Sequence, residues 1–163
     1  MAERKTRVGW GFDAHRFGTA GPVVLCGVEV DQTRGIEATS DGDVAVHALM
    51  DALLGAVGIG DLGTYFHSED PEMEGADSVQ LLRKVVLLLE HRSYRPGNVD
   101  VTIISESVRI APHHEAMRAA LAEALGIDIG AVSVKGTTTD GMGSIGADEG
   151  IAAAAVAFVY RDA

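Results

Sequence analysis

A helical pattern over residues 44–57, with the sequence VAVHALMDALLGAV, limits the choice of folds more than any other segment. Polar residues suited to capping a helix N-terminus come directly before it. These are Ser40, Asp41 and Asp43. A glycine-rich stretch, 58–63, is expected to end the helix in a flexible loop that carries Asp61. The sequence therefore predicts a helix with a defined start and end.

Strand and helix patterns alternate through the rest of the chain. Further helices are expected at 77–91, on a 3-4-3 apolar spacing, and from Pro112 to Leu125 with Gly126 as a stop. Strands are expected at 7–13, 98–105 and 132–136, and as a short pair over 23–30 broken at Gly27. The segment 150–160 is ambiguous, because its alanines favour helix and its Val-Ala-Phe-Val-Tyr end favours strand. These patterns predict an α/β or α+β fold.

The length of 163 residues suits one domain, 1–163, and no repeat or low-complexity linker divides it. The single cysteine, Cys26, excludes an intramolecular disulfide. Residues 1–10 lack a secretory hydrophobic stretch, and no apolar run approaches the ~20 residues of a membrane helix. We therefore expect a cytoplasmic protein with no membrane partner.

The net charge of −11 is unevenly distributed along the chain. It argues against nonspecific binding to nucleic acid or anionic membranes, because both need a basic face. No basic residue lies between Arg34 and Arg83, where ten acids fall. The acids are Glu37, Asp41, Asp43, Asp51, Asp61, Glu69, Asp70, Glu72, Glu74 and Asp77. They form either a solvated acidic face or a site that concentrates divalent cations.

Asp13, His15 and His47 are the candidate metal ligands. On an extended chain, Asp13 and His15 point to the same side and can meet one ion. His47 lies on the helix, with Asp43 one turn before it and Asp51 one turn after it. We expect one of these carboxylates to orient its second ring nitrogen. Two nitrogens and one oxygen with an open fourth position is a catalytic zinc pattern. The alternatives are a turn with a satisfied histidine and a surface polar cluster.

The segment 135–140, KGTTTD, carries a second set of polar residues. A strand that ends in three hydroxyl residues offers donors to phosphate oxygens, and Asp140 offers a ligand for Mg²⁺. The bland alternative is a strand with a polar end. The glycine-rich stretch 141–150 fits neither the dinucleotide fingerprint nor the P-loop pattern.

Taken together, these segments resemble the 2-C-methyl-D-erythritol 2,4-cyclodiphosphate synthase family of the non-mevalonate isoprenoid pathway. The resemblance runs almost from end to end of the chain. The matching segments are GFDAHRF (11–17), SDGDVAVHALMDALLGA (40–56), GDLG (60–63), GADS (75–78), NVDVTII (98–104), KGTTTD (135–140) and EGIA (149–152). The SDGD block followed by His47, placed after the Asp-x-His motif, is the most specific of these.

The resemblance implies a compact α/β (α+β) domain with a mixed sheet and helices on one side. It implies a homotrimer around a central axis, with active sites between subunits. The family converts 4-diphosphocytidyl-2-C-methyl-D-erythritol 2-phosphate into 2-C-methyl-D-erythritol 2,4-cyclodiphosphate and CMP. In that reaction the 2-phosphate attacks the β-phosphorus of the same molecule, so no protein nucleophile is required. An acidic chain would thus meet a phosphorylated substrate with cations taken from solution.

The resemblance also implies a role for particular residues. Asp13, His15 and His47 match the family's Zn²⁺ ligands, and Asp140 stands where a glutamate binds a second cation, Mg²⁺ or Mn²⁺, at the diphosphate. Thr138 and Thr39 occupy positions that support the transition state. The residues expected to contact substrate are Asp13, His15, Thr39, Ser40, Asp61, Gly63, Ser105, Arg109, Ile110, Ala111, Thr137, Thr138, Thr139 and Asp140. Among these, Asp61 and Gly63 match the loop for the erythritol part, and 105–111 matches the segment that cradles cytosine.

Three departures from the family pattern leave other functions open. Thr39 replaces a histidine before SDGD, Ser144 replaces an aromatic residue, and Ala147 replaces an arginine and is followed by Asp148. Threonine can donate one hydrogen bond but cannot be cationic. One alternative is a divergent paralogue that cyclises or cleaves another CDP-linked phosphate. The other is a zinc-binding trimer without turnover, which Thr138, Arg109 and Asp140 argue against.

Overall fold

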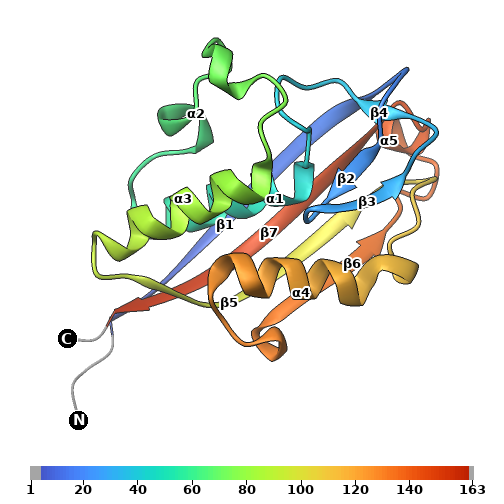
Figure 1. Ribbon diagram of the computed structural model, residues 1–163. Coiled ribbons are helices and arrows are strands. Elements are labelled where there is room, and N and C mark those ends of the chain that lie inside the picture. Colours follow the sequence, from blue (N-terminus) through green and yellow to red (C-terminus); the bar gives the residue numbers. More distant parts are fainter. Residues whose placement is uncertain (1–4, 162–163) are drawn as a thin grey trace.

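The computed structural model describes residues 5–161, which form a mixed five-stranded sheet and a separate hairpin (Figure 1). The sheet order is β4 (Gly35–Ile36), β1 (Lys5–Gly18), β7 (Gly150–Arg161), β5 (Arg95–Ile104) and β6 (Val132–Thr137). Only β5 and β6 pair in parallel, and the other neighbours are antiparallel. The hairpin consists of β2 (Val23–Leu25) and β3 (Val28–Asp31), as the break at Gly27 predicts.

The three long helices lie on one face of the sheet (Figure 1). They are α1 (Val44–Val57), α3 (Ser78–Glu90) and α4 (His114–Leu125). The shorter helices are α2 (Leu62–Tyr65) and α5 (Gly143–Gly146), and 3₁₀ turns occur at Pro71–Met73, Ala111–His113 and Ile129–Ala131. The expected α+β domain, with a mixed sheet and helices on one side, is confirmed.

Helix α1 has the bounds that the sequence predicts and lies at the centre of the core. The Asp43 side chain caps it by accepting from the Val46 backbone N–H, and Gly58 ends it in the left-handed conformation. Its backbone packs directly on β1 at Gly9 and Gly11, where a Cβ would lie 1.9 and 2.0 Å from the Ala52 and Ala48 carbonyl oxygens. The glycines therefore bring the helix close to the strand that carries Asp13 and His15.

The ambiguous segment 150–160 is a strand at the middle of the sheet. Along β7, every second residue from Ile151 to Val159 faces α1 and is buried. This alternation of buried residues is typical of a strand. β1 and β5 hydrogen-bond to its two edges. Tertiary pairing therefore overrides the helix propensity of its alanines.

The bounds of β1 and α4 differ from the sequence prediction near the candidate site residues, and β5 begins at Arg95 rather than at 98. β1 extends over 5–18 rather than 7–13, because β7 and then β4 pair with it along its whole length. The helix α4 begins at His114, and Pro112 lies in the 3₁₀ turn before it. Neither the change in β1 nor the change in α4 moves a candidate site residue away from the element expected to carry it.

The other face of the sheet exposes apolar side chains. Val8, Trp10 and Phe12 alternate along β1 and are 67%, 65% and 48% exposed, and Val156 of β7 is 41% exposed beside them. Trp10 and Phe12 stack with their ring centroids 6.2 Å apart. A contiguous exposed apolar face of this kind marks an interaction surface. Among residues 5–161, we find no helix of the length and apolar character required to span a bilayer.

Candidate active site

Asp13, His15 and His47 converge where β1 passes the first turn of α1. The Asp13 Oδ2 atom lies 2.9 Å from both His15 Nε2 and His47 Nδ1, and these ring nitrogens are 3.3 Å apart. Within the described residues, this is the one group of at least three acidic, histidine or cysteine side chains whose donor atoms converge. The structure thus brings together the ligand set that the sequence predicts.

A serine, and not a carboxylate, orients the second nitrogen of His47. His47 Nε2 lies 2.9 Å from Ser78 Oγ and 3.3 Å from Ser40 Oγ. The Ser78 hydroxyl and backbone N–H both donate to the Asp41 carboxylate. Because the Ser78 hydroxyl proton is directed at Asp41, Ser78 Oγ accepts from the Nε2–H of His47. The Nδ1 lone pair of His47 is then left facing Asp13, as a metal ligand requires.

The prediction that Asp43 or Asp51 orients His47 is therefore wrong. The Asp43 carboxylate is fully buried and accepts backbone N–H groups from Cys26, Gly27 and Val46 at 2.7–3.1 Å. Asp51 accepts the Leu62 N–H at 2.7 Å. Both carboxylates accept hydrogen bonds from backbone N–H groups that otherwise lack a partner. The spacing of residues along the helix does not predict these partners. Sequence reasoning missed the orienting role of Ser78, although the GADS motif contains it.

The electrostatics of the group fit a divalent cation. Burial alone raises the pKa of Asp13, but the adjacent imidazoles of His15 and His47, when protonated, hold it far below its ordinary range through hydrogen bonds and positive charge. The hydrogen bond to Asp13 raises the pKa of His15 against partial burial. Two imidazole nitrogens and one carboxylate oxygen suit Zn²⁺, with a coordination position left for a ligand.

The pH dependence of metal binding follows from these shifts. The raised pKa of His15 stabilises the folded state. This contribution is complete below pH 6.5, the ordinary pKa of histidine, and is lost as pH rises through the pKa of His15 in the folded protein. The lowered pKa of Asp13 contributes stability above 3.8, which is lost as pH falls. Metal must displace the His15 proton, so we expect Zn²⁺ affinity to rise about tenfold per pH unit below that pKa.

Differential scanning calorimetry from pH 5.5 to 8.5 checks this expectation. The Tm of the metal-free protein should fall toward high pH, while the increase in Tm caused by Zn²⁺ should grow. In Asp13→Asn, the same increase should be small at every pH. An increase in Tm that does not depend on pH would contradict the assignment of His15 as a ligand that loses a proton.

The candidate metal ligands Asp13, His15 and His47 open onto a cavity of about 200 Å³. Thr39 and Ser40 line it beside Asp13, His15 and His47, and its apolar lining includes Leu62, Phe66 and Met73. Thr39 therefore lies where its sequence position predicts, next to the ligands. Asp61 does not line this cavity and instead caps α2 by accepting from Thr64. Contact of Asp61 and Gly63 with a substrate stays a prediction.

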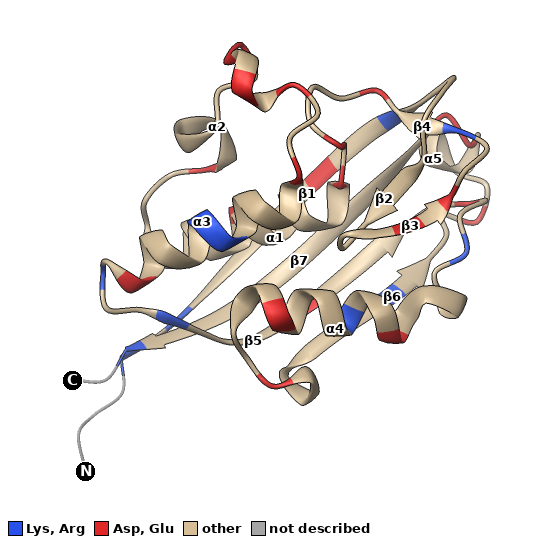
Figure 2. Cartoon of the chain, in the orientation of Figure 1, with Lys and Arg blue, Asp and Glu red and all other residues tan. Residues whose placement is uncertain are grey.

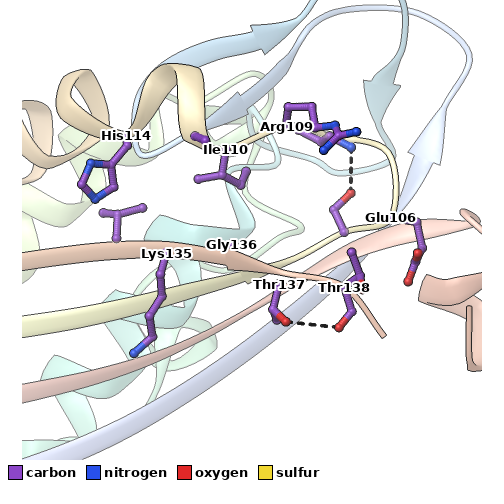
Figure 3. Close-up of a pocket in the computed structure, with 12 residues that line it drawn as sticks. Glu106, Arg109, Ile110, His114, Lys135, Gly136, Thr137 and Thr138 are labelled. Atoms are coloured by element: carbon purple, nitrogen blue, oxygen red, sulfur yellow. Dashed lines mark hydrogen bonds between the residues drawn. The ribbon is translucent and has the colours of Figure 1, made fainter. Parts of the chain in front are cut away.

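A second cavity of about 520 Å³ lies between the ends of β5 and β6 and the start of α4 (Figure 3). The segment 105–111 forms one wall and 134–138 the other. This cavity brings together the expected residues Ser105, Arg109, Ile110, Ala111, Thr137 and Thr138. Glu106 and His114 also line it, and sequence reasoning assigned neither to it. Its size suits a small-molecule ligand such as a nucleotide.

The turn after β6 holds the remaining expected residues. Asp140 has a positive φ of 57°, and its N–H donates to Thr138 Oγ1 at 3.2 Å. Thr139 donates through its N–H to Glu106 at 2.8 Å. Asp140 is not part of the Asp13, His15 and His47 group. Its role at a second cation stays a prediction.

The two cavities are separated within one chain. Residues Asp13, Ala153, Ile103 and Gly136 stand opposite one another across β1, β7, β5 and β6. Three strand spacings put the β1 and β6 positions about 14 Å apart. A ligand that touches both sets of residues must therefore be long, or the two sets must come from different copies of the chain.

Arg34 holds the segment 144–148, which contains two of the three departures from the family pattern, Ser144 and Ala147. Asp148, with a φ of 60°, accepts from Arg34 Nη1 at 3.0 Å and from Ser107 Oγ at 2.6 Å. Arg34 also stacks over the Phe17 ring at 4.0 Å. The charge of Asp148 is therefore paired. Ser144 lines a small cavity of about 220 Å³ beside His15, and the exposed Ala147 ends α5.

The acidic residues between Arg34 and Arg83 divide into two groups. Asp41 supports His47 through Ser78, as described above. Most of the others lie on the loops around α2 and the Pro71–Met73 turn (Figure 2). Asp61, Asp70 and Asp77 there cap short helices or α3. The acidic run therefore consists mainly of residues that cap helices and of solvated surface residues.

Fold and site together define an α+β protein with a group of side chains that could hold a metal ion and a separate nucleotide-sized cavity. The YgbB family model matches residues 6–160. Two curated relatives carry the name 2-C-methyl-D-erythritol 2,4-cyclodiphosphate synthase. The Thioalkalivibrio sulfidiphilus protein is 53% identical over 94% of this chain and 96% of its own length. The Symbiobacterium thermophilum protein is 51% identical over 93% of this chain and 97% of its own length. The chain belongs to the YgbB family, that of the 2-C-methyl-D-erythritol 2,4-cyclodiphosphate synthases.

Solved structures agree with this assignment. The bifunctional IspDF of Campylobacter jejuni superposes with a TM-score of 0.94 at 34% identity, over 98% of this chain. This chain spans 43% of that bifunctional protein. The CDP complex of IspF from Plasmodium falciparum superposes with a TM-score of 0.84 at 29% identity, over 97% of both chains.

Proposed function

We propose that this chain converts 4-diphosphocytidyl-2-C-methyl-D-erythritol 2-phosphate into 2-C-methyl-D-erythritol 2,4-cyclodiphosphate and CMP. An oxygen of the 2-phosphate attacks the β-phosphorus, and the bond from that phosphorus to the α-phosphate oxygen breaks as CMP leaves. The observation that carries the proposal is the convergence of Asp13, His15 and His47 on a cavity lined by Thr39 and Ser40. The relatives named 2-C-methyl-D-erythritol 2,4-cyclodiphosphate synthase, which are about 50% identical to this chain over nearly its whole length, support the proposal.

In this proposal the protein mainly holds a folded substrate, because the nucleophile and the electrophile belong to one molecule. Asp13, His15 and His47 would hold Zn²⁺, and Asp140 would contribute to binding Mg²⁺ or Mn²⁺. Such cations neutralise the charge of converging phosphates. Thr138 and Thr39 donate hydrogen bonds near the phosphorus, and Thr137 and Thr139 offer further donors.

The nucleotide end of the substrate would occupy the larger cavity. Ser105, Ile110 and Ala111 form the wall for cytosine, and the exposed Arg109 offers a positive charge toward the phosphates. The erythritol part would lie toward Asp61 and Gly63. The protein is expected to act in the cytoplasm, with neither nucleic acid nor membrane as a partner.

We propose a homotrimer as the active form. The exposed face around Trp10, Phe12 and Val156 is apolar, whereas the opposite face of the sheet is covered by helices. Burial of this face between copies removes apolar area from water. It would also bring the metal group of one copy to the nucleotide cavity of the next. Light scattering should give about three times the chain mass of 17.0 kDa; a monomeric mass would contradict the trimer.

An assay of CMP release tests the function. Protein stripped of metal with a chelator should release no CMP from the substrate, and adding back Zn²⁺ together with Mg²⁺ or Mn²⁺ should restore release. The product should be the cyclic diphosphate, identified by phosphorus NMR. Protein that binds Zn²⁺ but releases no CMP under any metal condition would favour a binding trimer without turnover.

A divergent paralogue is the second candidate, and Thr39 favours it. This residue lies beside the metal ligands, and a threonine there cannot supply the cationic imidazole expected from the family. A panel of CDP-linked phosphates decides between the two. If the erythritol substrate is the best of the panel and Thr39→His gains little on it, the paralogue interpretation is wrong. A faster reaction with another CDP-linked phosphate would support it.

A further inference from the structure

The turn between β6 and α5 carries Thr139, Asp140 and Gly141, and one side chain from another segment fastens it. Glu106 Oε1 accepts from the Thr139 N–H at 2.8 Å and the Gly141 N–H at 3.3 Å, and it lies 3.0 Å from the Thr139 hydroxyl, which is also 2.7 Å from the Met142 carbonyl oxygen. Glu106 comes from the opposite wall of the larger cavity, two residues after the end of β5 at Ile104. These bonds therefore join the two walls at one end of the cavity.

Glu106 is itself held in place by its neighbours. The Ser105 N–H donates to the Thr137 carbonyl at 3.0 Å, and Ser105 Oγ accepts the Val108 N–H at 3.2 Å. On the other side, Ser107 donates to Asp148 at 2.6 Å. The carboxylate thus projects from a segment that is hydrogen-bonded at both flanking positions, so it can act as a fixed anchor for the turn.

Hydrogen bonds between Thr139 and Met142 close the turn locally, and Glu106 ties it to the rest of the fold. Asp140 has a φ of 57°, which is uncommon for a residue with a Cβ, and Gly141 follows with a φ of 76°. Asp140 and Thr138 are exposed, so core packing does not hold them. Figure 3 shows Glu106 beside Thr138, at the end of the cavity away from His114 and Lys135. The hydrogen bonds of the turn to Glu106 lower the pKa of this carboxyl, which keeps it ionised as an acceptor.

We propose that Glu106 is a positioning residue, which holds the turn of Thr138, Thr139 and Asp140 in the shape that receives the phosphates of a cytidine nucleotide. The proposal rests on the proposed function for its ligand. Its physical consequence is counter-intuitive. A carboxylate near bound phosphates should weaken their binding by repulsion, yet this one should strengthen binding because it preorganises the donors.

Two variants distinguish repulsion from positioning, because the two effects change the affinity for CDP in opposite directions. Glu106→Gln removes the charge but keeps an oxygen that can accept the same N–H groups, whereas Glu106→Ala removes both. If repulsion dominates, both variants should bind CDP more tightly. If positioning dominates, Glu106→Ala should bind CDP in the presence of Mg²⁺ about tenfold more weakly, and Glu106→Gln should bind it at least as well as the natural protein. Glu29→Ala, at an exposed glutamate of β3, is the matched control.

Amide hydrogen exchange of the ligand-free protein tests the anchor without reference to function. The Thr139 and Gly141 amides should exchange about tenfold faster in Glu106→Ala, and much less so in Glu106→Gln, with the core strands unchanged. Unchanged exchange in Glu106→Ala would overturn the proposal whether or not the protein is an enzyme. Failure of the natural protein to bind CDP would instead count against the proposed function.

Titration with cytidine and CDP completes the test. Cytidine lacks phosphates, so its affinity should stay within about twofold in Glu106→Ala while that of CDP falls. Equal losses for both ligands would show that Glu106 supports only the general shape of the cavity. That result would overturn its assignment to the phosphate end.

Discussion

Replacing His47 by alanine is expected to reduce CMP release at least about a thousandfold, which corresponds to ~4 kcal/mol of transition-state stabilisation. The substitution removes a nitrogen that lies 2.9 Å from Asp13 Oδ2 and 3.3 Å from His15 Nε2. It leaves only two protein ligands, which is too few for a stable Zn²⁺ site. Zinc content, measured by atomic absorption, should fall together with activity.

The helical position of His47 allows this variant to fold. Alanine favours helix, and the lost side chain leaves space on the side of the cavity rather than in the apolar core. His91→Ala is the matched control, because His91 is exposed at the C-terminus of α3. It should keep both zinc and activity. A His47→Ala protein that retains full CMP release would contradict the proposed metal site.

A graded variant tests the orienting network behind His47. Ser78→Ala removes the acceptor that selects the metal-binding tautomer, while all three ligands remain. Loss of such a supporting partner typically weakens metal affinity 10–100-fold. We therefore expect Ser78→Ala to lie between the natural protein and His47→Ala. If Ser78→Ala equals the natural protein in zinc affinity, the hydrogen bond from His47 to Ser78 does not control the tautomer.

The second large effect concerns stability. Gly11→Ala should destabilise the fold by roughly 3 kcal/mol or more, because the new Cβ would lie 2.0 Å from the Ala48 carbonyl oxygen. Both the helix and the strand must move apart, since the clash is between two backbones. For a chain of this length the Tm should fall by roughly 10 °C.

Gly55→Ala is the control within the same helix. Nothing lies within 4 Å of the Cβ that it would add, and alanine is a better helix former than glycine. It should raise stability by about 0.5–1 kcal/mol. Urea unfolding followed by circular dichroism measures both variants. An unfolding midpoint for Gly11→Ala equal to that of the natural protein would show that α1 does not pack on β1 as closely as described.

Much of the fold could be predicted from local patterns. The bounds of α1 follow from its apolar run, its Asp43 cap and its terminal Gly58. Helix α3 similarly follows from its spacing and from Asp77, which caps it. β7 could not be predicted in this way, because its alanines are compatible with helix and only pairing with β1 and β5 on both edges makes it a strand.

The site shows the same division. The sequence by itself determined the candidate metal ligands, because the spacing of Asp13 and His15 on a strand and the placement of His47 on a capped helix depend on local geometry. Only the tertiary structure decided what supports them. Ser78 takes the role expected of Asp43 or Asp51, and Glu106 fastens a turn 33 residues away. The physical reason is that carboxylates accept from whichever unpaired donors the folded chain brings near, and those partners can be distant in sequence.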